Sequence, residues 1–342
     1  KKPVVAGGSY ASTSPEVVAA HADCVVVGEA EELIAPLVAA LERGAPLPAR
    51  LHAPDRPDVT RTPAPRYDLL DVAAYQSIGV QWSRGCPFNC EFCDIIEVFG
   101  RKPRTKTVPQ LLAELDAIFA TGFRGAVFLV DDNFIGNKVE ARRLLPRIGE
   151  WMRAHRHPFL LYTEASLNLA ADDALIDAMV DAGFGWVFIG IETPSPEALK
   201  LTQKLQNVAV DAMAGVHALT RRGLEVMAGF IVGFDTDDAE AVERQREWIA
   251  RAPIPLAMVG MLTALPGTQL ERRLAKEGRL VERSGGELFD RPNFVTRLDE
   301  TALLDGYARL LAAIYAPAAY FERAARTLEL CPREPSRFRP PP

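Results

Sequence analysis

The chain has 342 residues, of which 48% are hydrophobic and 25% are charged, and its formal net charge at pH 7 is −6. This composition is typical of a globular protein with a large core that needs no disulfide bonds. The acidic balance argues against a general nucleic-acid binder, so no nucleic-acid partner is expected. No run of about 18 apolar residues predicts a transmembrane segment, and no signal peptide is visible.

Residues 1–45 predict two βα units of a parallel α/β sheet. Short β-branched runs predict strands at 4–6 and 24–27, and helices are expected at 14–22 and 29–43. The chain lacks an initiating Met and its first strand begins almost at once, so we expect it to be cut from a larger domain.

Gly7 and Gly8 follow the first of these strands, and Gly28 follows the second. Open α/β sheets bind ligands at the carboxyl ends of their strands, so these glycines are candidate ligand contacts. Tight βα turns are the alternative explanation. Residues 46–76 are rich in proline and predict a linker or an extended strap.

Strands and helices alternate regularly through residues 77–264. Six βα units fit either a six-stranded partial barrel or an open doubly wound sheet, and both place the functional loops at the carboxyl ends of the strands. Residues 265–330 predict a mostly helical C-terminal extension, and residues 331–342 a loose tail. The predicted strands are 78–83, 126–130, 159–163, 186–191, 225–232 and 256–262, and the predicted helices are 107–120, 138–154, 172–182, 208–222, 237–252, 303–314 and 317–328.

Three of the five cysteines lie within eight positions, in the pattern CxxxCxxC: Cys86, Cys90 and Cys93. Thiolates at this density favour zinc, copper(I) or an iron–sulfur cluster. A 4Fe–4S cluster held by three thiolates leaves one iron open to a ligand from outside the protein. The zinc alternative lacks the second CxxC pair that such sites normally use. Cys24 and Cys331 lie far away in sequence, so we expect free thiols and a cytoplasmic protein.

Polar residues follow the predicted strands of residues 77–264 at their carboxyl ends. Asp131 and Asp132 follow the second strand, Glu164 the third and Glu192 the fourth. Together they predict a rim suited to a ligand with amino, carboxylate and hydroxyl groups. The alternatives are a plain strand-to-helix turn for the two aspartates and ordinary ion pairs for the two glutamates.

Four cations follow the cysteines within residues 101–106. A solvated face is the commoner explanation of such a stretch. The alternative is that Arg104 or Lys106 binds a carboxylate or offsets the charge of the cluster.

The cysteine pattern, with aromatic Phe92 directly before the third Cys, resembles the signature of the radical S-adenosylmethionine (SAM) enzymes. The resemblance implies a six-stranded partial barrel and a 4Fe–4S cluster on the three cysteines, with SAM chelating the open iron. By the same resemblance, Phe92 lies over the adenine. Further along the chain, the resemblance implies that Asp131 and Asp132 bind the methionyl amine; they stand in the place of a Gly-Gly-Glu motif that this sequence lacks. It also implies that Glu164 lies on the rim and that Glu192 binds the ribose. The implied contacts beside the adenine are Gly229, Ile231 and Gly233.

The two ends of the chain extend the resemblance. Gly7 and Gly8 fit the last Gly-Gly of a cobalamin-binding signature, whose earlier elements would lie upstream. Residues 265–268, 293–294 and 307–315 resemble the C-terminal extension of a subgroup of cobalamin-dependent radical SAM proteins that includes hopanoid methylases. Cobalamin is therefore the third expected cofactor.

The resemblance implies a reaction. A flavodoxin- or ferredoxin-type donor reduces the cluster, SAM is cleaved, and the resulting radical takes hydrogen from an unactivated carbon of a small-molecule or lipid substrate, for cobalamin-dependent C-methylation. A cobalamin-associated oxidoreductase or cyclase is one alternative, and a non-catalytic sensor is another. Methylthiolation is less favoured, because that group carries a second set of three cysteines.

Overall fold

The computed structural model describes residues 2–285 and 291–332. Its N-terminal unit is a small parallel sheet of order β1-β2-β3 with three short helices. The first residues of the segment predicted as a linker pair with β2 as the third strand. The elements are β1 (Val5–Ala6), α1 (Ser9–Thr13), α2 (Pro15–Val18), β2 (Cys24–Val27), α3 (Glu31–Glu42) and β3 (Arg50–His52).

The helix predicted at 14–22 is wrong in its bounds. The structure has two short helices instead, α1 and α2, which meet at Ser14. Ser14 has φ −136° and ψ 54°, outside the helical region. Pro15 explains the break, because the ring of a proline disfavours helical geometry in the residue before it.

The centre of the molecule is a six-stranded, wholly parallel sheet of order β11-β10-β9-β8-β7-β4. Its two outer strands, β4 and β11, do not pair with each other, so the sheet stays open along one side. This confirms the predicted α/β class and agrees with a partial barrel. The strands are β4 (Ser77–Val80), β7 (Ala126–Leu129), β8 (Leu160–Ala165), β9 (Phe184–Glu192), β10 (Glu225–Val232) and β11 (Ala257–Met261).

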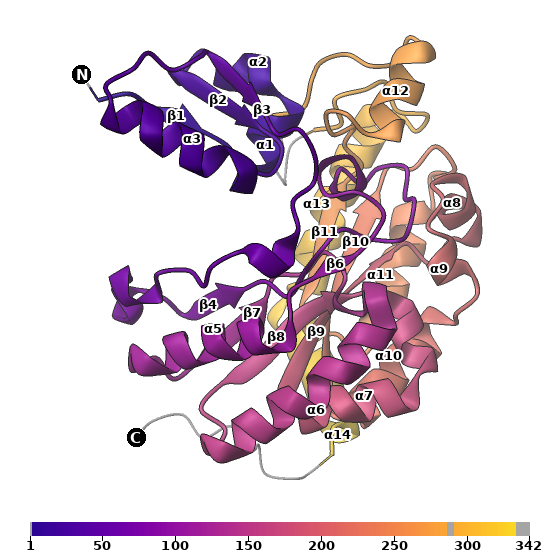
Figure 1. Cartoon of the computed structure of the whole chain (residues 1–342). Helices are drawn as coiled ribbons and strands as arrows, with labels where there is room; N and C mark the ends of the chain where they lie inside the picture. Colours follow the sequence, from indigo (N-terminus) through magenta and orange to yellow (C-terminus); the bar gives the residue numbers. More distant parts are fainter. Residues whose placement is uncertain (1, 286–290, 333–342) are drawn as a thin grey trace.

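Helices cover the outer face of this sheet (Figure 1). Apolar side chains at helical spacing make the contacts; on α5, for example, Leu111, Leu115 and Ile118 are fully or nearly fully buried. These helices are α5 (Val108–Ala120), α6 (Lys138–Ala154), α7 (Asp173–Asp181), α10 (Ala212–Arg221) and α11 (Ala241–Arg251). The loops at the strand ends contain the short helices α4 (Ile95–Val98), α8 (Pro196–Leu201) and α9 (Leu205–Val208). Turns of 3-10 helix lie at Val59–Arg61, Tyr67–Leu69, Val72–Ala74, Phe134–Asn137 and Leu167–Ala171.

Three further helices follow the last strand: α12 (Gln269–Lys276), α13 (Glu300–Ile314) and α14 (Pro317–Leu330). The N-terminal unit and α12 lie at the same end of the central sheet (Figure 1). Most of the tail predicted to be loose, residues 331–342, lies outside the described residues. Within the described residues, no helix is both long and apolar enough to cross a membrane.

The N-terminal unit is joined to the barrel by buried ion pairs. Glu29 is 7% exposed and lies 2.7 Å from Arg84 and 2.5 Å from Arg104. Arg84 and Arg104 face each other across a two-stranded antiparallel ribbon, β5 (Ser83–Arg84) and β6 (Arg104–Thr105). Lys106 forms a separate buried pair with Glu114. The solvated-face explanation is therefore wrong for Arg104 and Lys106, because both bind carboxylates inside the protein.

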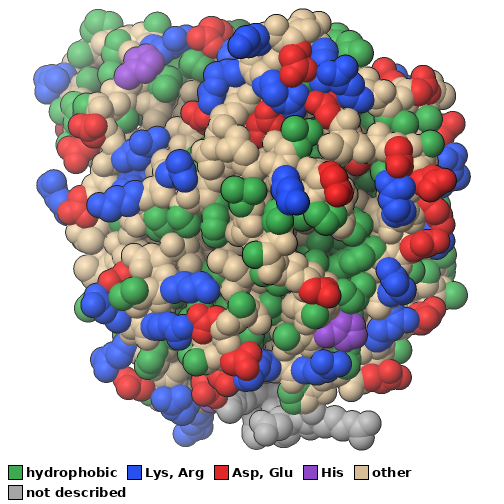
Figure 2. All heavy atoms as spheres, turned by 90° about the vertical axis from the view of Figure 1, so that its right-hand side faces the viewer, with side chains coloured by type: hydrophobic (Ala, Val, Ile, Leu, Met, Phe, Trp, Pro, Cys, Tyr) green, Lys and Arg blue, Asp and Glu red, His purple; other side chains and the backbone are tan. Residues whose placement is uncertain are grey.

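Charged side chains of both signs are interspersed on the face shown in Figure 2, with hydrophobic side chains gathered in a band across its middle. The charge on this face is therefore mixed, in keeping with the small net charge of the chain.

Candidate functional site

The cysteine loop leaves the sheet after β4 through the β5–β6 ribbon. At its start, Gly85 has φ 95°, and a Cβ there would lie 2.8 Å from the carbonyl oxygen of Gly100. The amide of Cys86 donates a hydrogen bond to that same carbonyl, at 3.2 Å. Only glycine fits this turn, because the backbone of the loop folds back against itself.

Asp131 and Asp132 hold the chain that leads into the loop. The carboxylate of Asp131 accepts hydrogen bonds from the amides of Trp82 (2.7 Å) and Ser83 (3.0 Å) and from the Ser83 hydroxyl (2.9 Å). Asp132 accepts one from the amide of Gly85, at 2.7 Å. Burial raises the pKa of Asp132, and that of Asp131 to about 7. Both aspartates thus position the loop, and their binding of a methionyl amine stays a prediction.

Amide and ammonium groups surround the three thiols. Asn133 Nδ2 lies 3.8 Å from the sulfur of Cys86, and Gln206 Nε2 lies 3.4 Å from that of Cys90. Such N–H groups stabilise thiolates and tune the potential of an iron–sulfur cluster. Asn133 directly follows Asp131 and Asp132 in the sequence, whereas Gln206 lies on α9, whose four residues are too few to show a helical period.

The thiols themselves suit a cluster. No disulfide joins them, and burial raises the pKa of Cys86, and that of Cys93 to about 12. Thiols buried this deeply ionise when a metal takes the place of the proton. In the described part of the chain, no three His, Cys, Asp or Glu side chains gather to hold one metal ion. Each thiolate of a 4Fe–4S cluster binds a different iron, so the three cysteines need not converge on a single metal ion.

A buried ion pair lies beside the thiols. Lys204 Nζ is 2.5 Å from Glu192 Oε1 and 5.8 Å from the centre of the Phe92 ring. Burial opposes the charge on Lys204, but Glu192 and the thiols of Cys90 and Cys93 outweigh it and raise the pKa of Lys204. A Cβ on Gly190 would meet this pair, 2.9 Å from Lys204 Nζ. The sequence predicted Glu192 but missed Lys204.

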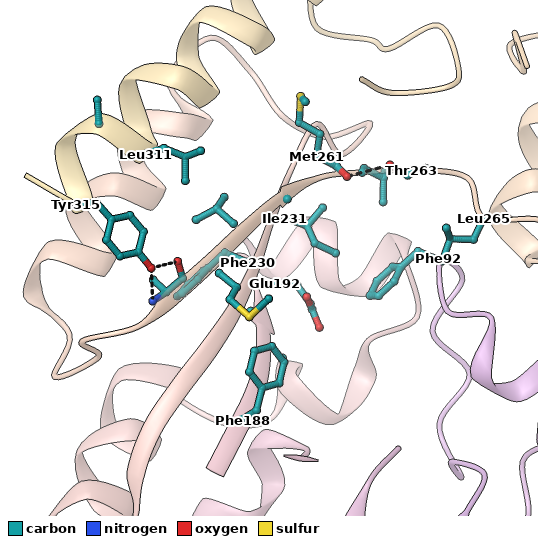
Figure 3. A pocket seen from close by; sticks show the side chains of 18 residues that line it. Phe92, Phe188, Glu192, Phe230, Ile231, Met261, Thr263, Leu265, Leu311 and Tyr315 are labelled. Carbon is teal, nitrogen blue, oxygen red and sulfur yellow. Dashed lines mark hydrogen bonds between the residues drawn. The ribbon is translucent and has the colours of Figure 1, made fainter. Parts of the chain in front are cut away.

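A large apolar cavity of about 820 Å³ begins at the cysteine loop and runs along β9, β10 and the whole length of β11 (Figure 3). Of the predicted cofactor contacts, it brings together Phe92, Glu192, Gly229 and Ile231. Gly229 is needed there, because a Cβ would lie 2.8 Å from the Phe188 ring. The remaining lining residues are Phe188, Gly190, Phe230, Ala257, Met258, Val259, Gly260, Met261, Leu262, Thr263, Leu265, Leu311, Ala312 and Tyr315.

Like Asp131 and Asp132, the predicted residues Gly233 and Glu164 lie outside this lining. The amide of Gly233 donates a hydrogen bond to the Asp237 carboxylate at 2.8 Å, and this bond caps the end of β10. Glu164 lies on β8, and burial raises its pKa to about 7, with the charge of Asp132 adding to the rise and that of Lys204 opposing it. Glu164 therefore lies within electrostatic reach of both the loop and the Glu192–Lys204 pair.

A second cavity, of about 390 Å³, separates the N-terminal unit from the cysteine loop. Gly8, Ser12 and Gly28 line it on one side, and Arg84 and Phe99 on the other. Gly8 (φ 104°) and Gly28 (φ 90°) both adopt the left-handed conformation, and a Cβ on Gly8 would meet no atom within 4 Å. Predicted residue Gly7 does not line this cavity; it lies against Val26.

The segment around α12 fixes the loop from the other side. Glu91, between Cys90 and Phe92, is 6% exposed and accepts hydrogen bonds from Arg273 at 2.5 and 3.2 Å. The Glu91 carbonyl also accepts the amide of Leu270, at 2.9 Å. Arg273 reaches Asp235 as well, at 2.8 Å, so one guanidinium ties the cysteine loop to the end of β10.

Replacing Arg273 by Ala should lower the free energy of unfolding by about 1–3 kcal/mol, because the buried carboxylate of Glu91 loses its partner. Arg272→Ala is the matched control on the same helix, since its pair with Glu97 is more exposed and contributes about 0–1 kcal/mol. Urea unfolding of both variants measures the difference. Equal losses would show that the Arg273 contacts do not stabilise the loop.

The family model of the radical SAM superfamily matches residues 80–249, which include the cysteine loop and strands β7 to β10. This chain belongs to the radical SAM superfamily. This membership confirms the predicted family, and it confirms a 4Fe–4S cluster and SAM as the cofactors to expect. A second model, for a domain of unknown function (DUF4070), matches residues 268–340 of this radical SAM protein.

Curated relatives of this radical SAM protein include methyltransferases. It is 44% identical to an uncharacterised methyltransferase of Synechocystis sp., over 95% of this chain and 61% of the relative. It is 38% identical to the hopanoid C-2 methylase of Rhodopseudomonas palustris, over 94% of this chain and 60% of that protein. The chain thus spans about 60% of the length of these two relatives.

Two solved structures share the fold. One is the radical SAM methyltransferase TsrM from Kitasatospora setae, with cobalamin and a 4Fe–4S cluster bound, at a TM-score of 0.69 and 17% identity over 92% of this chain and 73% of that chain. The other is the cobalamin-dependent radical SAM enzyme OxsB, at a TM-score of 0.71 and 17% identity over 95% of this chain and 59% of that chain.

Proposed function

We propose that the protein is a cobalamin-dependent radical SAM methyltransferase that methylates an unactivated carbon of an apolar small molecule or lipid. The observation that carries this proposal is the position of the cysteine loop between two cavities. On one side lies the apolar cavity that reaches Phe92, and on the other lies the cleft lined by Gly8 and Gly28. The names of the two curated relatives, a methyltransferase and a hopanoid methylase, support methyl transfer.

When bound, the cluster and SAM supply a carbon radical that can take hydrogen from an unactivated carbon. Cys86, Cys90 and Cys93 would hold the cluster. The charge of Lys204 acts on all three thiols, and it offsets the negative charge that the thiolates bring into a buried place. The apolar walls of the larger cavity exclude water from the reacting atoms.

Cobalamin would lie at the smaller cavity, between the N-terminal unit and the loop. The open space at Gly8 and the small side chains of Ser9 and Ser12 leave room for the edge of a bulky cofactor. The Glu29–Arg84 and Glu29–Arg104 pairs would hold the two sides in register. The flavodoxin- or ferredoxin-type donor and the cytoplasmic location stay predictions.

The test is anaerobic turnover of the full-length protein with SAM, a reductant, methylcobalamin and a hopanoid lipid. We expect both 5′-deoxyadenosine and S-adenosylhomocysteine, together with a methylated lipid. Deoxyadenosine without S-adenosylhomocysteine would contradict methyl transfer and favour an oxidoreductase or cyclase. If SAM stays intact under every condition, the protein is no radical enzyme and the sensor alternative takes its place.

Binding of SAM should depend on pH through Glu164, which we propose binds the ammonium of SAM. The raised pKa of about 7 means that Glu164 gains a proton, and loses its charge, as the pH falls below that value. The affinity for SAM should therefore fall by about tenfold or more on the acid side of pH 7.

Equilibrium dialysis of cluster-loaded protein against SAM measures this dependence. Glu164→Gln should bind SAM weakly at all pH values, because the amide keeps the shape of the side chain without its charge. An unchanged pH profile in that variant would assign the dependence to another group.

A further inference from the structure

We propose that α13, which lies in the segment matched by the domain of unknown function, is the wall of the apolar cavity that selects the substrate. Leu311, Ala312 and Tyr315 would contact a large, uncharged, apolar molecule at the end of the cavity remote from the cysteines. This inference rests on the proposed function, since it takes the cavity as the place where the substrate of the radical reaction binds.

The first argument is that α13 is fixed to the open side of the barrel. Strand β11 has a partner on one side only, so its other edge presents unpaired backbone groups. The Tyr315 hydroxyl donates to the carbonyl of Ala257 at 2.8 Å and accepts from the amide of Ala257 at 3.2 Å. The Tyr307 hydroxyl donates to the carbonyl of Val259 at 2.9 Å. Two tyrosines thus place α13 along the edge of the sheet.

The second argument comes from the faces of α13. Leu303, Tyr307, Leu310 and Ile314 recur at helical spacing and are buried in the main core. That face is fully used in packing. The cavity-lining side chains Leu311 and Tyr315 lie beside it, four residues apart, and project toward β11 (Figure 3). A helix that packs with one face and lines a cavity with the next is a rigid part of the binding site.

The third argument is the chemistry of the lining. Its polar side chains already have partners within the protein. Glu192 pairs with Lys204, Tyr315 bonds to Ala257, and the Thr263 hydroxyl donates to the carbonyl of Met261 at 3.2 Å. A polar or charged substrate group would lose its water there without gaining a partner, which is costly. A cavity of about 820 Å³ with such walls favours a large uncharged molecule through burial of apolar surface.

The fourth argument is the order of residues along the cavity. Phe92 and Leu265 lie at one end, beside the cysteine loop, and Leu311 and Tyr315 lie at the other (Figure 3). Contacts remote from the reacting atom decide how a substrate is placed along a site. The shape of the α13 wall therefore determines which molecule fits and which of its carbons reaches the cysteine end.

The test uses two fluorescent probes of matched shape on the purified holoprotein. N-phenyl-1-naphthylamine is uncharged, and 1-anilinonaphthalene-8-sulfonate is a similar molecule with a negative charge. We expect the uncharged probe to bind about tenfold or more tightly than the sulfonate, since the described residues that line the cavity include no Lys or Arg. Equal affinity for the two probes would overturn the proposed chemistry of the cavity.

The role of α13 is tested with Ala312→Phe, which adds a ring to the wall. This variant should weaken binding of the uncharged probe by about tenfold or more. Ala302→Phe is the matched control on the same helix, because Ala302 is exposed, does not line the cavity, and lies on the opposite side of the helix from Leu311. Unchanged affinity in Ala312→Phe, or an equal loss in both variants, would overturn the proposal.

Leu311→Phe provides a second variant if Ala312→Phe does not fold, and the melting temperature of each variant is measured beside its affinity. Because probe binding needs no SAM cleavage, this experiment can fail while turnover succeeds, and the reverse. The failure of this inference can therefore be told apart from the failure of the proposed function.

Discussion

Alanine in place of Cys86, Cys90 or Cys93 should abolish the brown absorbance of the 4Fe–4S cluster and, with it, the cleavage of SAM. Each thiolate of such a cluster binds its own iron, so the loss of one leaves an iron that no neighbouring side chain can hold. Cys24 and Cys331 cannot substitute, because Cys24 lies fully buried in the N-terminal sheet and Cys331 follows α14. Iron and sulfide content and the yield of 5′-deoxyadenosine measure the effect.

Cys331→Ser is the control for this series. It changes the same type of residue outside the loop and should leave both the cluster content and SAM cleavage intact. A loop variant that kept its full iron and sulfide content would refute the ligand assignment.

Lys204→Met should lower the free energy of unfolding by about 3–5 kcal/mol, since it leaves Glu192 as a buried carboxylate without its partner. The two side chains are 12% and 9% exposed and lie 2.5 Å apart. The variant should also make the cluster harder to reduce, because a positive charge that acts on the thiolates is gone. Urea unfolding gives the first quantity, and a redox titration of the cluster gives the second.

Two comparisons distinguish the effect of losing the Lys204–Glu192 pair from a general effect of replacing a cation by Met. Arg246→Met breaks an exposed pair with Glu243 and should cost about 0–1 kcal/mol. The double variant Lys204→Met/Glu192→Gln should recover part of the stability, because it removes the uncompensated charge. A Lys204→Met protein as stable as the Arg246→Met protein would show that the buried pair contributes nothing.

Much of the barrel could be predicted from local patterns. Strand β10 was expected at 225–232 and occupies those residues, because a continuous apolar run between Gly223 and Gly233 has one interpretation. The short helices α8 and α9 were not predicted, since six and four residues are too few to show a helical period. The break at Ser14 was missed, although Pro15 carried the signal.

The candidate site was predictable in part. The cysteine spacing and the polar residues at the strand ends located it, because parallel strands bring their carboxyl ends to one rim. The contacts that those residues make could not be predicted from the sequence. Asp131 was expected to meet a ligand, yet its oxygens accept hydrogen bonds from Trp82 and Ser83.

The sequence by itself determined the family and the parallel α/β class of this radical SAM protein, and it predicts the three cluster cysteines. These properties follow from residue spacing, which is local. Only the tertiary structure decided which side chains meet: Lys204 with Glu192, Arg273 with Glu91, and α13 with the edge of β11. Such contacts join segments up to 182 residues apart. Their geometry depends on how whole elements pack, and no local pattern encodes it.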